Sequence, residues 1–302
     1  MVFRKRRREV PADDVSNIGP TFTRGGHNAS TYCYILSLLA AFSSVLPENI
    51  SWAAGVPFFS LILSARTNAL GKNWGVTSLV ENFFEVAPQK QQEIVCMALK
   101  ILQFPYVSQI ALMFTKTINN MVMYQRKCSH CSYETAKELN EPIIHCSLNS
   151  AMNLSGLLGG QHSFTKCEAC ENGQVRSQWQ IMSTGDILVV YYSRHHNLKD
   201  SIPDRTKAPA VTYETLSIGD LLYTYELRSV ILHTPRKCVK PDSEEVPLQA
   251  GARLDKGHYS CIQLESVSSS ILHNDDILQR INGFNVVANY AGKIVMAFYM
   301  KV

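Results

Sequence analysis

Residues 25–42 read GGHNASTYCYILSLLAAF, a polar, turn-prone run that passes directly into a long apolar one. Asn28 and the hydroxyl residues after it are good helix N-cap residues, and the apolar run over residues 33–46 is long enough for about three helical turns. We therefore expect a helix that begins near Cys33. A thiol in this position has two interpretations: a small buried hydrophobe, or a nucleophile whose thiolate is stabilised by the beginning of a helix.

Length and composition indicate a globular protein with one large domain or two ordinary ones. The chain has 302 residues, and 46% of them are hydrophobic, well above the disordered range. The net charge is only +4, and residues 3–8, FRKRRR, hold five of the 29 basic residues. The remainder is close to neutral. A nucleic-acid-binding surface on the folded part is not expected, because phosphate binding needs a basic face.

The charged N-terminus has two interpretations. Residues 1–19 form either a solvated, disordered arm or a nuclear-import signal or contact for an acidic partner. No secretory signal is expected, because the first residues are charged and no apolar stretch follows them. The uncharged segment 49–65 is interrupted by Asn, Gly, Pro and Ser, which favours a buried segment of the fold over a membrane span. These features predict an intracellular protein of the nucleus or cytoplasm, and the basic cluster at residues 4–8 favours the nucleus.

The expected secondary structure changes along the chain. QQEIVCMALKILQF, residues 91–104, has apolar positions at helical spacing and lies between two prolines. From about residue 117 the chain consists of short β-branched and aromatic runs separated by turn residues, among them VRSQWQIM, GDILVVYYSR, YTYELRSVILHT, GHYSCIQL and KIVMAFYMKV. Helices early and strands late predict an α+β domain.

Two Cys-x-x-Cys pairs, CSHC and CEAC, lie in the strand-rich part. Nine cysteines without a secretory signal argue against a disulfide framework. Four thiolates in two tight turns are the ligand set of a structural zinc ion, so the sequence predicts one closed, non-catalytic Zn²⁺ site. Its ligands would be Cys128, Cys131, Cys167 and Cys170. The gap between the pairs is longer than in a compact zinc ribbon, so strands must lie between them. The alternatives are reduced thiols without a metal, and ligation by His130 or His145.

A nucleophilic thiol needs an imidazole base, and the base needs an acceptor that orients it. His258 in GHYSCIQL follows a long polar loop and begins an expected strand, which is a rigid place for a base. Downstream, ILHNDDILQRI places Asn274, Asp275 and Asp276 at the next turn, and a hairpin would bring them back alongside His258. These residue types allow a Cys33/His258/Asp arrangement. They equally allow a core cysteine, a surface histidine and an Asx turn.

The order of these blocks resembles that of the ubiquitin-specific proteases, a family of papain-like cysteine deubiquitinases. GGHNASTYCYILSLL is similar to the family's Cys box and QQEIVCMALKIL to the helix that follows it. CSHC and CEAC are similar to its zinc pairs, and GHYSC with HNDD to its His box and third-residue box. The resemblance covers about residues 20–302. It implies a single catalytic domain with the papain-like cysteine protease fold, a helical thumb, a β-rich palm and zinc-ribbon-like fingers over about residues 117–190.

The resemblance also implies catalytic roles for the matching residues. Cys33 would attack the carbonyl carbon of ubiquitin's C-terminal Gly, and His258 would take the thiol proton and later protonate the leaving amine. Asp275 or Asn274 would orient His258, and the match leaves both open. Asn28 would donate a hydrogen bond to the oxyanion of the tetrahedral intermediate.

Two further matches concern substrate binding. Glu93 corresponds to an acidic family position near the arginines of the ubiquitin tail, and Tyr259 would pack beside that tail. The four zinc-pair cysteines would hold the fingers that grip ubiquitin's globular body. Several family positions differ in this chain, which indicates a divergent member of the family. Among them are Ser30, Tyr32, Leu36, Ala40, His195 and Ile262.

The predicted function is therefore that of a thiol-dependent deubiquitinase that binds ubiquitin and ubiquitinated proteins. It would cleave the isopeptide or peptide bond after ubiquitin's C-terminal Gly. One alternative is a ubiquitin-binding scaffold that keeps the fold with little or no turnover. The other is a protease for another ubiquitin-like modifier such as SUMO.

Overall fold

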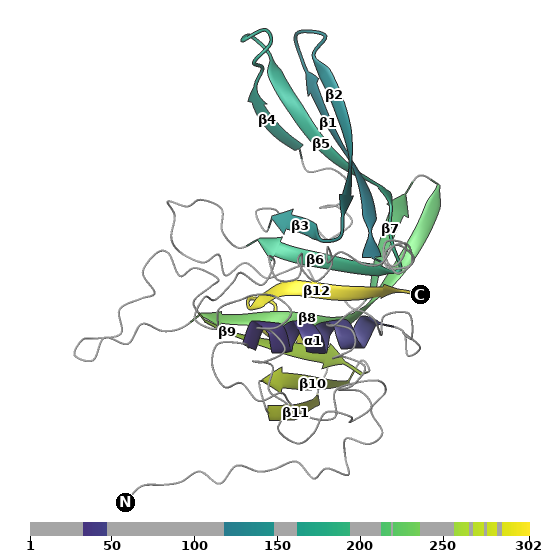
Figure 1. Cartoon of the computed structure of the whole chain (residues 1–302), viewed down its shortest axis with the longest axis vertical. Helices are drawn as coiled ribbons and strands as arrows, with labels where there is room; N and C mark the ends of the chain where they lie inside the picture. Colours follow the sequence, from purple (N-terminus) through teal and green to yellow (C-terminus); the bar gives the residue numbers. More distant parts are fainter. Residues whose placement is uncertain are drawn as a thin grey trace, which may run out of the picture.

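The computed structural model describes two β-sheets and the helix that begins at Cys33 (Figure 1). The described residues are 33–46, 118–147, 162–193, 213–218, 220–235, 257–265, 268–274, 277–282 and 286–302. The N-terminal arm, the helix expected at residues 91–104 and the rest of the expected helical thumb lie outside them. Within these ranges no helix is long and apolar enough to cross a membrane.

The first helix, α1, spans Cys33–Val45 and confirms the helix expected from the polar-to-apolar junction. Every residue of α1 except Ser44 is buried. A helix that is apolar on all sides is stable only in the interior of a fold, and α1 has this character. Two of its serine hydroxyls bond within the helix, since Ser43 Oγ donates to Ala40 O and Ser44 Oγ donates to Ala41 O, each at 2.7 Å.

The larger sheet, the palm sheet, has eight strands in the order β11-β10-β9-β8-β12-β6-β3, with β7 paired to one part of β8. Its pairs are antiparallel except for β3 and β6. The strands are β3 (Ile144–Ser147), β6 (Ile187–Ser193), β7 (Tyr213–Ile218), β8 (Leu221–Pro235), β9 (Gly257–Leu264), β10 (Ser269–Asn274), β11 (Ile277–Asn282) and β12 (Ile294–Lys301). A short helix, α7 (Val286–Tyr290), precedes β12.

The central strands of the palm sheet have hydrophobic core on both faces: α1 packs against one face, and an apolar cluster that includes Val190, Val230 and Ala297 lies on the other. α1 lies along β8 and β9 in Figure 1, and the Phe42 ring meets the Phe298 ring of β12 edge-on at 5.2 Å between centroids. β12 and β6 carry continuous apolar runs, because both faces of these central strands are buried. The palm sheet is therefore a rigid platform for the side chains at its strand ends.

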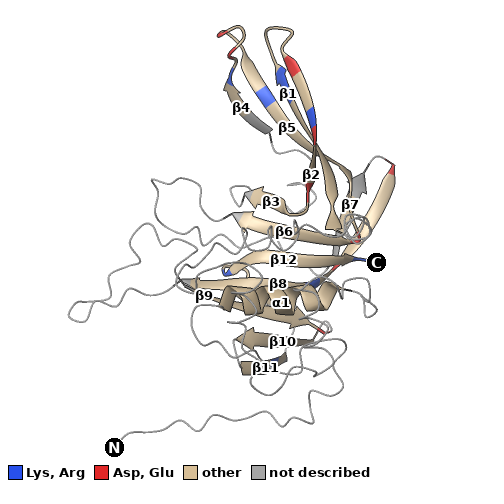
Figure 2. Cartoon of the chain, viewed as in Figure 1, with Lys and Arg blue, Asp and Glu red and all other residues tan. Residues whose placement is uncertain are grey.

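The smaller sheet, the finger sheet, has four strands in the order β2-β1-β5-β4 and projects away from the palm sheet (Figure 1). The strands are β1 (Asn120–Cys128), β2 (Glu134–Glu141), β4 (His162–Lys166) and β5 (Gln174–Ser183), and all neighbours are antiparallel. Figure 2 shows charged residues of both signs along this sheet, whereas α1, β6 and β12 carry almost none. The finger sheet is thus largely solvated, and the palm sheet is largely buried.

Candidate active site and metal centre

His258 and Asn274 form a hydrogen-bonded pair across two neighbouring strands. His258 is the second residue of β9, and Asn274 is the last residue of β10, which pairs antiparallel with β9. His258 Nε2 lies 2.5 Å from Asn274 Oδ1. The hairpin expected from the sequence therefore brings the candidate base together with one of its two candidate orienting residues. Asp275, the other candidate, lies outside the described residues.

This contact fixes the tautomer of the imidazole. An amide oxygen only accepts hydrogen bonds, so the ring proton must be on Nε2, where His258 donates it to Asn274 Oδ1. In the neutral ring the basic lone pair is then on Nδ1. Nδ1 is the nitrogen able to accept a proton from a thiol.

Cys33 is the first residue of α1, and its side chain is only 4% exposed. The first turn of a helix has backbone N–H groups without a partner in the helix, and these groups stabilise a negative charge. Among the described elements, α1 makes its most extensive contact with β9, the strand of His258. The two elements that carry the candidate nucleophile and the candidate base are therefore direct packing partners.

The remaining candidates for substrate contacts are only partly described. Tyr259 is 3% exposed, and its ring packs against the His233 ring with 4.8 Å between centroids. Tyr259 thus supports the beginning of β9 from within the core. Asn28 and Glu93 lie outside the described residues.

A buried polar network that the sequence analysis did not single out connects α1 with β9 and β10. The amide of Gln263 donates from Nε2 to Ala40 O (2.6 Å) and to Ser43 Oγ (2.8 Å), and its Oε1 lies 2.7 Å from His273 Nε2. Gln263 is 1% exposed and His273 is 6% exposed. Burial lowers the pKa of His273 to about 3, so its ring is neutral at physiological pH. The sequence signal was a single amide in the largely apolar run YSCIQL, followed by a strand whose last residue but one is a histidine.

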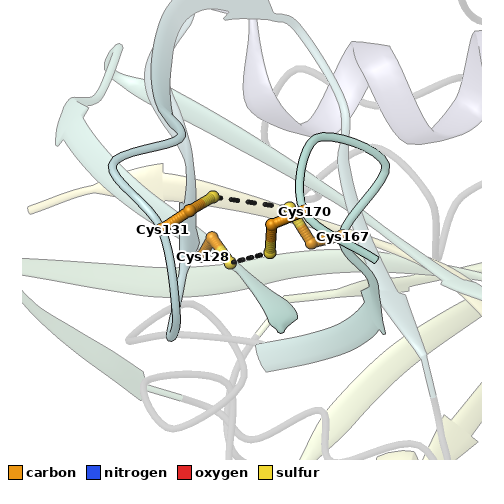
Figure 3. A group of neighbouring side chains, drawn as sticks. All are labelled: Cys128, Cys131, Cys167 and Cys170. Carbon is orange, nitrogen blue, oxygen red and sulfur yellow. Dashed lines mark hydrogen bonds between the residues drawn. The ribbon is translucent and has the colours of Figure 1, made fainter. Parts of the chain in front are cut away.

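The four cysteines of the two Cys-x-x-Cys pairs converge at the tip of the finger sheet (Figure 3). Their sulfur atoms all lie within 4.8 Å of one another, with Cys128 and Cys170 at 3.7 Å and Cys131 and Cys167 at 3.8 Å. A tetrahedron with zinc–sulfur bonds of ~2.3 Å has sulfur–sulfur edges of about 3.8 Å. These separations are far longer than a disulfide bond of ~2.05 Å. The cluster therefore has the donor set and the spacing of a structural zinc site.

The first Cys-x-x-Cys turn directs backbone N–H groups at its sulfur. Cys128 N donates to Tyr133 O (2.9 Å), which closes the turn, and His130 N donates to Cys128 Sγ (3.3 Å). This N–H group holds the pKa of the Cys128 thiol below its usual range. A sulfur in such a turn is prepared to act as a thiolate ligand.

The second turn requires special backbone geometry. Glu171 N donates to Cys167 O (3.0 Å) and Cys167 N donates to Gly173 O (2.8 Å), and Glu171 lies in the left-handed region with φ of 56°. A Cβ atom added to Gly173 would be 2.5 Å from Cys128 Sγ and 3.2 Å from Cys170 Sγ. A glycine is therefore needed at this position for the two turns to approach each other.

Comparison with known proteins places this architecture in a known fold. No family model and no curated protein matches the sequence. The structure matches a solved SAGA DUB module of Ubp8, Sgf11, Sus1 and Sgf73 bound to monoubiquitin, with a TM-score of 0.64 and 13% identity over 92% of this chain and 69% of that chain. It also matches a Ubp8–Sgf11–Sgf73–Sus1 module with a TM-score of 0.68 and 13% identity over 97% of this chain and 70% of that chain.

This chain has the ubiquitin-specific protease fold. The resemblance of the sequence blocks to that family is thereby confirmed at the level of the fold. In this fold the palm sheet carries His258 and Asn274, α1 begins at Cys33, and the finger sheet ends in the four-cysteine cluster.

Proposed function

We propose that this chain is a thiol-dependent deubiquitinase with Cys33 as nucleophile, His258 as base and Asn274 as orienting residue. It would cleave the isopeptide or peptide bond after the C-terminal Gly of ubiquitin. The observation that carries the proposal is the His258–Asn274 hydrogen bond, beside a helix that begins at a cysteine. The contact favours Asn274 over Asp275 as the orienting residue. The similarity to a monoubiquitin-bound module supports ubiquitin as the substrate.

The direction of α1 supports a functional pair of Cys33 and His258. Ala40 and Ser43 contact Gln263, which is the last residue but one of β9. Cys33 precedes Ala40 by about 10 Å of helix, and His258 precedes Gln263 by about 17 Å of strand. Since α1 contacts β9 more than any other described element, we infer that the helix runs back along the strand from this anchor. That direction carries Cys33 toward the His258 end of β9.

The proposed chemistry follows from the proton positions. His258 Nδ1 takes the proton from the Cys33 thiol, and the thiolate attacks the carbonyl carbon of the terminal Gly. Asn28 would donate to the oxyanion of the tetrahedral intermediate, a contact whose removal typically costs ~3 kcal/mol in the barrier. The imidazolium then protonates the leaving amine, and water hydrolyses the thioester with His258 again as base. Asn274 keeps the ring in the tautomer that both steps require.

The proposed ubiquitin contacts lie on three parts of the chain. Glu93 would meet the arginines of the ubiquitin tail, and Tyr259 would support the strand along which the tail lies. The four cysteines of the finger tip would hold one Zn²⁺, which supplies structural cross-linking and takes no part in hydrolysis because all four coordination positions are filled. Residues 20–302 would form the single catalytic domain, with fingers over about residues 117–190. The basic residues 4–8 would act in nuclear import.

Covalent labelling with a ubiquitin that carries a thiol-reactive C-terminal group tests the proposal. The wild type should form an adduct one ubiquitin larger than the chain, and Cys33→Ala should form none. The matched control is Cys261→Ala, because Cys261 is a fully buried cysteine on the same strand as His258. This variant should keep the adduct. His258→Ala should slow labelling by 10²–10⁴-fold, the range for loss of a general base.

Other results would replace the proposal. An adduct with the corresponding SUMO probe but not with ubiquitin would identify a protease for another modifier. No adduct with either probe, together with retained binding of unmodified ubiquitin, would identify a non-catalytic ubiquitin-binding scaffold. An adduct that persists in Cys33→Ala would assign the nucleophile to another cysteine.

A further inference from the structure

We propose that Gln263 is a positioning residue that holds the helix of the nucleophile in register with the two strands that carry the base and its orienting partner. This inference rests on the proposed function, since the register matters only if Cys33, His258 and Asn274 act together. Gln263 itself does not approach the reacting atoms, because it stands five residues beyond His258 on β9.

The amide of Gln263 is satisfied on three sides by groups from two other elements. Both N–H bonds point into α1, toward Ala40 O at 2.6 Å and Ser43 Oγ at 2.8 Å. Because an amide NH₂ has two donors, this leaves Oε1 as the acceptor for His273 Nε2–H at 2.7 Å. One side chain thus joins α1, β9 and β10, which are the three elements of the proposed catalytic residues.

Burial makes this arrangement selective for one register. Gln263 is 1% exposed, Ser43 is fully buried and His273 is 6% exposed, so no solvent is available to replace a lost partner. A buried polar group without a partner is strongly disfavoured, whereas apolar contacts between a helix and a sheet tolerate small displacements. Most of the rest of α1 is apolar, and Ser229 of β8 adds a second polar contact, with Ala41 O and Ser44 Oγ. The Gln263 network permits only the position in which all donors and acceptors are paired.

The network also reaches the catalytic pair directly. His273 immediately precedes Asn274 on β10, and the Cα partner of His273 on β9 is Cys261. The His273 side chain therefore reaches diagonally across the pair to Gln263, a contact that fixes the end of β10 against β9. Displacement of this end would move the amide of Asn274 relative to His258. The network thus sets both the helix-to-strand distance and the strand-to-strand position on which the site depends.

Steady-state kinetics of the full chain with a fluorogenic ubiquitin C-terminal amide tests the role of Gln263. Gln263→Leu, which removes all three hydrogen bonds at similar volume, should lower kcat by ~10–100-fold and leave KM unchanged, since the ubiquitin-binding surface is untouched. The matched control is Ser229→Ala. Ser229 lies on β8 and is also fully buried. Its Oγ also contacts α1, donating to Ala41 O at 3.3 Å and accepting from Ser44 Oγ at 2.9 Å. However, β8 carries no proposed catalytic residue. This control should lower thermal stability and keep kcat.

A second pair of variants guards against a loss of folding. His273→Gln retains an N–H donor near the position of the imidazole Nε2, and His273→Leu does not. We expect kcat of His273→Gln to fall less than kcat of His273→Leu. Equal kcat values in these two variants, with both folded, would contradict the proposal. A kcat loss in Ser229→Ala equal to that in Gln263→Leu would contradict it as well, because it would show that general loosening of α1 is sufficient.

The rate at which iodoacetamide alkylates Cys33, followed by mass spectrometry between pH 5 and pH 9, separates this inference from the proposed function. If Cys33 and His258 form a pair, His258→Ala changes the pH profile, and Gln263→Leu should shift the profile in the same direction. If the wild type is active and Gln263→Leu has the same pH profile of Cys33 alkylation as the wild type, only the positioning role of Gln263 is overturned. If the wild type is inactive and His258→Ala does not change the pH profile of Cys33 alkylation, the proposed function is overturned. The positioning role of Gln263 is then overturned as well.

Discussion

The palm sheet and the finger sheet are stabilised by different means. In the palm, both faces of the central strands are buried. One face carries a continuous apolar cluster that includes Tyr192, Tyr225 and Tyr299, and on the other face Phe298 packs against Phe42 of α1. At the described finger tip the buried cluster consists of Cys128, Cys167 and Val175. β2 is exposed along most of its length, and Phe164 of β4 is 62% exposed.

This difference shows that burial alone cannot account for the order of the finger tip. Two of the three buried residues there are cysteines, and a cluster of this size removes little apolar surface from water. A bound metal ion supplies the missing free energy in small domains of this kind, typically ~10–16 kcal/mol for structural zinc in isolated peptides. The palm, in contrast, has the apolar core to fold without a metal. Stability of the two sheets should therefore respond to different changes.

Loss of the zinc ion proposed for the four-cysteine cluster should give the largest effect, and this effect should be confined to the fingers. Cys167→Ser removes one ligand, or a strong chelator removes the ion. Amide hydrogen exchange at the finger tip, including the N–H groups of Cys128 and Ser129, should accelerate by several orders of magnitude. Exchange in β8, β9 and β12 should stay within a few-fold of the wild type. If the palm lost its protection from hydrogen exchange together with the finger tip, the two sheets would unfold as one cooperative unit. The contrast between a metal-stabilised finger tip and an independently stable palm would then be wrong.

Cys146→Ser is the matched control for this experiment. Cys146 is also a buried cysteine, at 1% exposure, but it lies on β3 in the palm core cluster. Its replacement should leave one zinc ion bound per chain by elemental analysis, and should lower the stability of the palm instead.

Truncation of a palm core side chain should give the next largest effect. Phe298→Ala removes a fully buried ring that meets Phe42 at 5.2 Å, and the expected loss in free energy of unfolding is ~3–5 kcal/mol. The control is Phe164→Ala on the exposed face of the fingers, with an expected change within about 0.5 kcal/mol. Urea unfolding followed by near-ultraviolet circular dichroism measures both. Similar losses for the two variants would mean that the finger sheet contains a second apolar core.

The sequence predicts those features of the fold that depend on local chemistry. The polar-to-apolar junction marks the beginning of α1, Cys-x-x-Cys spacing brings each sulfur pair together, and apolar runs such as KIVMAFYMKV become the central strands. β2, with the sequence ETAKELNE, was not expected as a strand. It has no apolar alternation and no β-branched residue other than Thr135, and it is held by its pairing with β1 along its whole length.

The sequence could not distinguish Asn274 from Asp275 as the partner of His258. Consecutive residues of a strand point to opposite faces of the sheet, so a shift of β10 by one residue relative to β9 would exchange their positions. The observed register of β10 against β9 directs Asn274 Oδ1 to His258. The Gln263–His273 contact is diagonal across two strands and depends on the same register. Neither contact follows from residue spacing alone. The register is set by the tertiary packing of the palm sheet, not by the local pattern.

Acid should destabilise the palm through His273, with an intermediate effect. Burial lowers the folded-state pKa of His273 to about 3, so between about pH 6.5 and pH 3 the unfolded chain binds a proton that the folded chain does not. Stability is then complete above about pH 6.5 and falls as pH decreases, by up to ~1.4 kcal/mol per pH unit from this residue. The loss of unfolding free energy between pH 7.5 and pH 5.5 is measured by urea unfolding of the wild type and of His273→Gln. Hydrogen exchange in β9 and β10 at the same two pH values locates it in the palm. An equal loss in both proteins would assign the acid sensitivity to other groups.

The smallest effect should be a gain of stability at the finger tip. Among the described residues Glu171 is the one non-glycine with a positive φ, 56°, and this conformation costs roughly 1–2 kcal/mol for a residue with a Cβ atom. Glu171→Gly removes that strain but adds entropy to the unfolded chain, so the net gain should be ~0.5–1 kcal/mol, or a ~2–5-fold increase in zinc affinity in a competition titration. Glu168→Gly removes the same charge from the same turn without relieving a positive φ, and it should weaken binding slightly. If both variants bind zinc more tightly, the gain comes from the lost charge and the turn is not strained. If only Glu171→Gly does, backbone geometry limits the stability of the finger tip, whereas side-chain packing limits that of the palm.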